Sequence, residues 1–167
     1  MNDTVNKIDE AVDMIDRKSC YLIKILCVGL ISAVLLTGCG GSANNTLEDY
    51  FSDNQSARDS VISEINGQFE STGAKSNVEV EGNDITVIID ITDLAHDQGI
   101  EKTNKNVKIF KEEFEESFGN QESSFKNSLS GLASKVHSGS ITMKVKIVWD
   151  DDVIFSDSFK GDPADKK

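Results

Sequence analysis

The sequence predicts a single α+β domain of helix, hairpin, helix, hairpin order, preceded by an N-terminal export segment. Two stretches, 78–91 and 141–149, alternate apolar and polar residues with the period of two that a half-buried strand needs. Between them, apolar residues from Val107 to Val136 recur every three, four or seven positions, which keeps one helical face. A four-stranded antiparallel sheet with the helices packed on one face would bury both patterns.

The first 38 residues read as an N-terminal extension followed by a signal peptide. Ile25–Leu36 is a run of twelve residues without a charge, shorter than the roughly 20 that span a membrane. Arg17, Lys18 and Lys24 precede the run, as in the basic region of a secretory signal. Translation from Met14 would give a conventional basic start, whereas Met1 adds an acidic extension, so both starts stay open.

The end of this run resembles the lipobox of bacterial lipoproteins, Leu36-Thr37-Gly38-Cys39. The resemblance implies that a signal peptidase recognises Leu36, Thr37 and Gly38 and cuts before Cys39. It also implies that the Cys39 sulfur carries a diacylglyceryl group, with acylation of the new amino terminus left open. The competing interpretation, a buried cysteine closing a core helix, does not explain the basic, apolar, small-residue order.

Composition restricts what the exported chain can do. The whole chain has 17 basic and 29 acidic residues, and the 129 residues from Cys39 keep a net charge of −11. That charge argues against nucleic acid as a partner and against adsorption to anionic lipid. We therefore expect membrane attachment through the acyl chains on Cys39. Since the other two cysteines precede Cys39, the mature chain has no second thiol for a disulfide.

A short linker, 39–45, leads into the predicted domain, 46–160, which a polar tail, 161–167, follows. Thr46 and Asp49 approximate a capping box, so a short helix begins there, and a longer one runs from Ser56 to about 71–73. The Gly82-Asn83 pair between two alternating runs predicts the first hairpin. Residues 92–105 are polar and are expected to form a loop.

The long helix carries the phenylalanine stripe, with Gly119-Asn120 as a point where it kinks or splits. The second hairpin begins after 137–139 and turns at Asp150-Asp151-Asp152. One shared core is expected to bury nine apolar residues: Val78, Val80, Val87, Ile89, Phe110, Phe114, Leu129, Val145 and Ile147.

The opening Thr46–Phe51, the Val78/Val80 hairpin, the phenylalanine helix and the closing hairpin together resemble a small uncharacterised domain. That domain is found in lipoproteins of clostridia and related Gram-positive bacteria. The resemblance covers nearly the whole mature chain, and it implies a fold and an extracytoplasmic location. It carries no functional residues over to this sequence.

Candidate chemical groups are few. His96 lies near Asp93 and Asp97, and His137 ends the long helix, but no Gly-x-Ser-x-Gly motif supplies a nucleophile. The acidic run Asp150–Asp152 lacks the calcium-loop pattern, which favours a solvated turn. We therefore predict no catalytic residue, metal or cofactor, and a cell-membrane lipoprotein that binds a protein or cell-wall ligand. The alternatives are a lipid-anchored hydrolase or metal-dependent enzyme centred on His96, and an accessory lipoprotein without a specific ligand.

Overall fold

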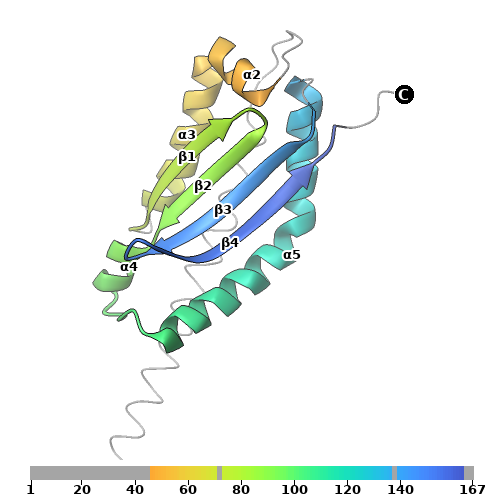
Figure 1. The fold of residues 1–167 in the computed structure, drawn as a ribbon. Coiled ribbons are helices and arrows are strands. Elements are labelled where there is room, and N and C mark those ends of the chain that lie inside the picture. The colour runs from red at the N-terminus through yellow and green to blue at the C-terminus, as the bar shows by residue number, and fades with distance from the viewer. Residues whose placement is uncertain (1–45, 71–72, 137–138, 164–167) are drawn as a thin grey trace, which may run out of the picture.

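The computed structural model describes residues 46–70, 73–136 and 139–163, and Figure 1 shows their arrangement. The predicted export segment, Cys39 and most of the predicted polar tail lie outside these ranges. The elements follow in the order α2 (Leu47–Asp53), α3 (Gln55–Glu70), β1 (Lys75–Glu81), β2 (Asp84–Asp90), α4 (Thr92–Asp97), α5 (Asn104–Val136), β3 (Ile141–Trp149) and β4 (Asp152–Gly161).

The four strands form one sheet in the order β1-β2-β3-β4. The two hairpins are antiparallel as predicted, but the central pair, β2 with β3, is parallel, so the prediction of a wholly antiparallel sheet is wrong. The reason is the length of α5. At 1.5 Å per residue its 33 residues measure about 50 Å, enough to carry the chain back along the sheet before β3 begins. Such a helical crossover produces parallel neighbours.

The N-terminus of α2 is fixed to the first hairpin turn. The predicted capping box is confirmed, because the Thr46 side chain accepts from the Asp49 N–H and the Asp49 side chain accepts from the Thr46 N–H. Gly82, at φ +58°, occupies the first turn position, as in a type II′ hairpin. Its carbonyl accepts from the Glu48 N–H at 2.9 Å, while its own N–H donates to the Glu48 carboxylate at 2.8 Å. Helix α2 therefore lies beside the β1–β2 turn.

The expectation of a loop over 92–105 is wrong in its first half, where α4 forms. Its apolar residues Leu94 and Ala95 are buried, although the surrounding sequence is polar. The Asp90 side chain accepts from the Thr92 N–H at 2.9 Å, which starts the turn directly after β2. Gly99, at φ +68°, then follows the helix in the left-handed conformation common after helix ends.

Helix α5 is continuous through Gly119-Asn120, so the helix is not split there. Figure 1 shows that it changes direction along its length while staying against the sheet. Its apolar face stacks on β4: the ring centroids of Phe118 and Phe155 are 5.4 Å apart, and those of Phe125 and Phe159 are 4.5 Å apart. The phenylalanine stripe is thus a core face, as expected.

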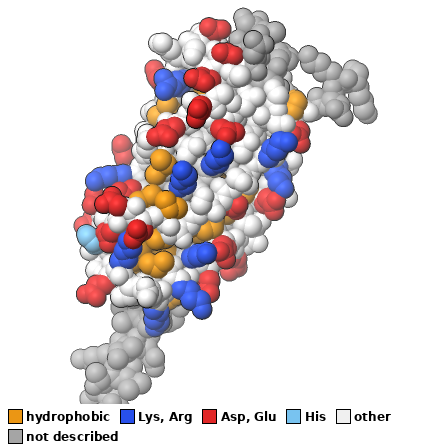
Figure 2. Space-filling model, in the orientation of Figure 1, with side chains coloured by type: hydrophobic (Ala, Val, Ile, Leu, Met, Phe, Trp, Pro, Cys, Tyr) orange, Lys and Arg blue, Asp and Glu red, His pale blue; other side chains and the backbone are white. Residues whose placement is uncertain are grey.

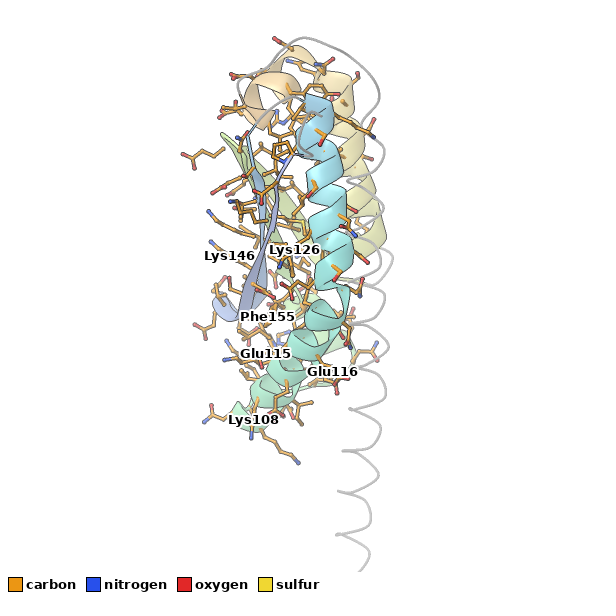
Figure 3. All side chains as sticks on the ribbon, turned by 90° about the vertical axis from the view of Figure 1, so that its right-hand side faces the viewer. Lys108, Glu115, Glu116, Lys126, Lys146 and Phe155 are labelled. Carbon is orange, nitrogen blue, oxygen red and sulfur yellow. The ribbon has the colours of Figure 1, made fainter. Side chains whose placement is uncertain are left out.

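Helices α3 and α5 lie on the same face of the sheet and leave the other face uncovered (Figure 1). Figure 3 shows Phe155 between the sheet and α5, with Lys146 projecting from the opposite side. All nine predicted core residues are buried except Val80, which is half-buried. Val80 lies near the end of the edge strand β1, next to the β1–β2 turn.

Candidate functional site

The structure places His96 at the end of the sheet, on α4. Its Nε2 lies 3.7 Å from the nearer carboxylate oxygen of Asp150, and both side chains are largely exposed. Asp93 instead pairs with Lys75 at 2.7 Å. Asp93 also lies close enough for the charge of His96 to act on it. In the described part of the chain, no serine, threonine or lysine side chain forms a hydrogen bond with the imidazole. His137 lies outside the described residues.

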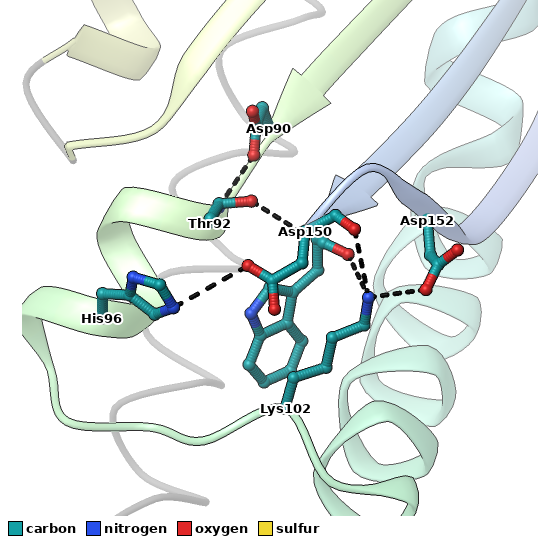
Figure 4. Close-up of polar contacts among 7 residues, drawn as sticks. Asp90, Thr92, His96, Lys102, Asp150 and Asp152 are labelled. Atoms are coloured by element: carbon teal, nitrogen blue, oxygen red, sulfur yellow. Dashed lines mark hydrogen bonds and ion pairs between the residues drawn. The ribbon is translucent and has the colours of Figure 1, made fainter.

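The acidic turn is held by a lysine that the sequence did not single out (Figure 4). The Lys102 ammonium donates to the carbonyl of Trp149 at 2.6 Å, to that of Asp150 at 3.4 Å and to the Asp152 carboxylate at 2.7 Å. Thr92 Oγ1 accepts from the Asp150 N–H at 2.8 Å. The turn itself consists of Asp150 and Asp151, since Asp152 already belongs to β4.

These contacts account for the acidic run Asp150–Asp152 as part of a turn, and the explanation needs no bound ligand. Asp150 and Asp151 adopt φ values of +48° and +65°, as the central residues of a type I′ turn require. The Lys102 ammonium occupies the oxygen-rich side of the turn and supplies the positive charge there. Across 46–70, 73–136 and 139–163, no three His, Cys, Asp or Glu side chains are grouped so as to hold a metal ion.

Two exposed carboxyl groups have perturbed pKa values, and both belong to surface ion pairs. The hydrogen bond and the charge of Lys75 lower the pKa of Asp93, and Asp93 in turn raises the pKa of Lys75. A hydrogen bond from Ser140, followed by the contact with Lys160, lowers the pKa of Asp162. Exposed pairs of this kind stabilise a fold only slightly.

The described surface is hollowed where α2 and α3 meet β1. The hollow has a volume of about 210 Å³, and it is called the β1 groove here; its lining residues are Glu48, Phe51, Ser52, Gln55, Arg58 and Val80. Sites for drug-sized molecules usually measure about 300–1,000 Å³. The β1 groove is smaller, and its size suits a side chain or a chain end better than a whole organic ligand.

The β1 groove has an apolar floor and a charged rim. Phe51 is almost fully buried and Val80 half-buried, whereas Arg58 is exposed on the first turns of α3. The Glu48 carboxylate on the same rim already accepts from the Gly82 N–H. Among the described residues, Arg58 forms no ion pair, and it is the single arginine between 46 and 163. The β1 groove thus has one cation, Arg58, and one carboxylate, Glu48, on its rim.

The two edges of the sheet differ in a way that bears on binding. In β4, a register shift interrupts the pairing with β3 near Ile147 and Val148, and Asp157 lies in register with the buried Val145, on the helix side. Bulges and inward-pointing charges are devices that keep further strands from adding to an edge. In β1, seven consecutive residues pair with β2 without a shift. The regular, seven-residue edge lies beside the β1 groove.

The uncovered sheet face carries separated charges, and Figure 2 views it directly. Lysines lie on β3 and β4, namely Lys144, Lys146 and Lys160, and carboxylates lie mainly on β1 and β2, namely Glu79, Glu81, Asp84 and Asp90. Lys144 and Asp84 form an ion pair across the β2–β3 junction. This face is therefore a surface of mixed charge.

Sequence reasoning missed Arg58 and Lys102, because each acts through residues distant in the chain. The one available signal for Arg58 was its rarity in a chain of many lysines. For Lys102 there was none, since its partner Asp152 lies 50 positions later.

The fold and these surfaces define a small α+β domain with a surface groove beside one sheet edge. Residues 47–159 match a protein family described as a domain of unknown function (DUF4854), and the chain belongs to that family. This agrees with the expected resemblance to a small uncharacterised domain. Comparisons with the curated proteins and with the solved structures found no match. Within the described ranges, no helix has the length and apolar character needed to cross a bilayer.

Proposed function

We propose that this chain is a lipid-anchored, extracytoplasmic lipoprotein whose domain acts by binding. The observation that carries the binding role is the β1 groove, which Arg58, Phe51 and Val80 line together next to a regular sheet edge. The anchor is argued from the sequence Leu36-Thr37-Gly38-Cys39 at the end of an uncharged run.

Attachment through Cys39 would keep the domain near the membrane surface. Two acyl chains hold a protein firmly, whereas one gives only marginal binding. The six residues Gly40–Asn45 reach at most about 20 Å when extended, and α2 begins directly after Thr46. With a net charge of −11 from Cys39 onward, the domain itself is repelled by anionic headgroups, so the acyl chains must supply the attachment.

A binding role accounts for the described contacts better than the alternative of an enzyme centred on His96. Nucleophilic catalysis needs a hydroxyl or thiol within hydrogen-bond reach of the base. His96 has the Asp150 carboxylate at 3.7 Å, and among the residues that the structure describes no hydroxyl or thiol forms a hydrogen bond with it. Lys102 is committed to the turn carbonyls and to Asp152.

Cys39→Ser tests the anchor in cells grown with a labelled fatty acid. The variant is expected to lose the lipid label and either to accumulate as precursor or to appear in the medium. Cys27→Ser, which removes a thiol from the uncharged run without changing 36–39, serves as the control and should be labelled normally. A Cys39 thiol found unmodified and still joined to Gly38 by mass spectrometry would overturn the anchor.

His96→Ala and His137→Ala separate binding from catalysis. A binding module should capture the same molecules from native membranes whether or not the histidines are present. Loss of a measurable hydrolytic or metal-dependent activity in either variant would favour the enzyme instead.

A further inference from the structure

We propose that the β1 groove and the outer edge of β1 bind an extended peptide with a free C-terminal carboxylate, which adds to the sheet as a fifth strand. This inference rests on the proposed binding function and names its ligand class. Three features support it: the regular edge of β1, the apolar floor of the β1 groove and the charge of Arg58.

The edge of β1 has the properties that strand addition requires. Its seven residues keep an unbroken register with β2, and within the described ranges no other strand pairs with them, so the opposite backbone groups face away from the sheet. Peptides that bind by strand addition gain main-chain hydrogen bonds along such an edge. The β4 edge is the poorer candidate because of its register shift and its inward-facing Asp157.

The β1 groove would receive side chains of the added strand. Alternate residues of a strand point to the same face of a sheet, so every second side chain of the peptide would face the helices. There it meets Val80 of β1 and, on α3, Ile62, which is half-buried and lies one helical turn beyond Arg58. With Phe51 as the floor, a volume of about 210 Å³ favours an apolar side chain close to the peptide terminus.

Charge decides which end of the peptide lies in the groove. The net charge of −11 from Cys39 onward repels peptides with acidic side chains, so the terminal carboxylate is expected to be the one anionic group of the peptide. Arg58 can pair with that carboxylate through two parallel N–H donors. Glu48, on the same rim, has one carboxylate oxygen held toward the β1–β2 turn by the Gly82 N–H. Since Val80 lies at the C-terminal end of β1, a peptide ending at Arg58 runs parallel to β1.

The test uses the full chain purified in detergent and two pools of random N-acetylated hexapeptides, one with free carboxyl ends and one amidated. Peptides retained by the immobilised chain are identified by mass spectrometry, and affinities of the strongest are measured by fluorescence anisotropy. We expect retention from the free-carboxyl pool, with a loss of at least tenfold in affinity on amidation. Equal retention from both pools would overturn the proposal.

Arg58→Gln should lower the affinity of a retained peptide at least tenfold, and Arg58→Lys should keep part of it. Lys108→Gln is the matched control, because it removes one exposed helical cation on α5 and should leave the affinity unchanged. Both positions are exposed, so neither change is expected to disturb folding. An affinity unaffected by Arg58→Gln would contradict the assignment of the carboxylate to this residue.

Hydrogen exchange distinguishes strand addition from other modes of binding. Bound peptide should slow amide exchange in 75–81 and leave 152–161 unchanged. Slower exchange in β4 alone would overturn the proposal. So would slower exchange in β1 that appears without peptide and grows with protein concentration, because it would indicate a second copy of the chain at this edge. The Cys39 experiment is independent: a lipidated chain that retains no peptide refutes this inference alone, and a peptide-binding chain without lipid refutes only the anchor.

Discussion

Gly161, the last residue of β4, lies so close to Ser130 in α5 that a Cβ on Gly161 would come within 2.3 Å of the Ser130 backbone nitrogen. The same Cβ would stand 2.4 Å from the Cβ of Leu129, which is fully buried. Neither neighbour is the end of a flexible side chain. The strand and the helix can therefore approach each other here only because residue 161 has no side chain.

Gly161→Ala should destabilise the fold by about 1–3 kcal/mol, the usual cost of overpacking a filled core. Urea denaturation followed through the fluorescence of Trp149, the single tryptophan, measures this change. Gly67→Ala is the matched control: Gly67 lies inside α3 with nothing within 4 Å of an added Cβ, and the change should stabilise by about 0.5–1 kcal/mol. Equal stabilities for the two variants would refute the close contact.

Val145→Asp should unfold the chain or leave it strongly destabilised. Val145 is fully buried in the central strand β3, so the new carboxylate would lose its water without gaining a partner. Lys146→Asp, one position later on the uncovered face, changes the charge in solvent and should leave a cooperative transition. Thermal unfolding by circular dichroism compares the two, and a normal transition for Val145→Asp would mean that the sheet faces are assigned wrongly.

Lys102→Met should loosen the β3–β4 turn and cost about 1–3 kcal/mol, because the carbonyls of Trp149 and Asp150 lose a charged donor. Amide exchange at 150–152 is expected to accelerate. Lys108→Met, on an exposed turn of α5, should stay within about 0.5 kcal/mol of the parent chain. Unchanged exchange at the turn would show that Lys102 does not hold it.

The Lys75–Asp93 pair predicts a pH-dependent contribution to the stability of the fold, which is lost at both low and high pH. The pKa of Asp93 is lowered by Lys75, so its contribution to stability is present above the unfolded value, about 4, and is lost as pH falls through the folded pKa. The pKa of Lys75 is raised, so its contribution is present below about 10.4 and is lost as pH rises through the folded pKa.

Carbon NMR of the Asp93 carboxyl group tests this pair directly. Its titration midpoint should lie below that of an ordinary aspartate and should rise in Lys75→Met. Lys108→Met provides the control and should not move the midpoint. An Asp93 titration that is identical in the parent chain and Lys75→Met would contradict the pairing.

Local patterns predicted most of the fold, because periodicity and turn chemistry are encoded by neighbouring residues. The alternation around Gly82, the capping box at Thr46 and the phenylalanine stripe of α5 are all confirmed. The parallel pairing of β2 with β3 could not be predicted in this way. It depends on the path of α5 over the sheet, and neither strand has a residue pattern that identifies the strand beside it.

The candidate site was less predictable than the fold for the same reason. Phe51, Arg58 and Val80 come from three elements, and nothing in their spacing indicates that they line one hollow. The sequence pointed instead to His96 and to the acidic run Asp150–Asp152, because these residue types by themselves suggest catalysis or metal binding. The role of Lys102 depends on the folded β3–β4 turn, which brings the Asp152 carboxylate to its ammonium group.

The parallel centre of the sheet also governs the order in which the chain can fold. Each hairpin forms from adjacent residues, but the ion pair between Asp84 and Lys144 joins positions 60 residues apart. Contacts of such sequence separation slow folding, because a long loop must close before they form. Helix α3, which precedes the first hairpin, packs on β1, but the inner edge of β2 stays unpaired until α5 has carried the chain back to β3. A chain shortened before β3 would therefore leave the first hairpin without its neighbour in the sheet.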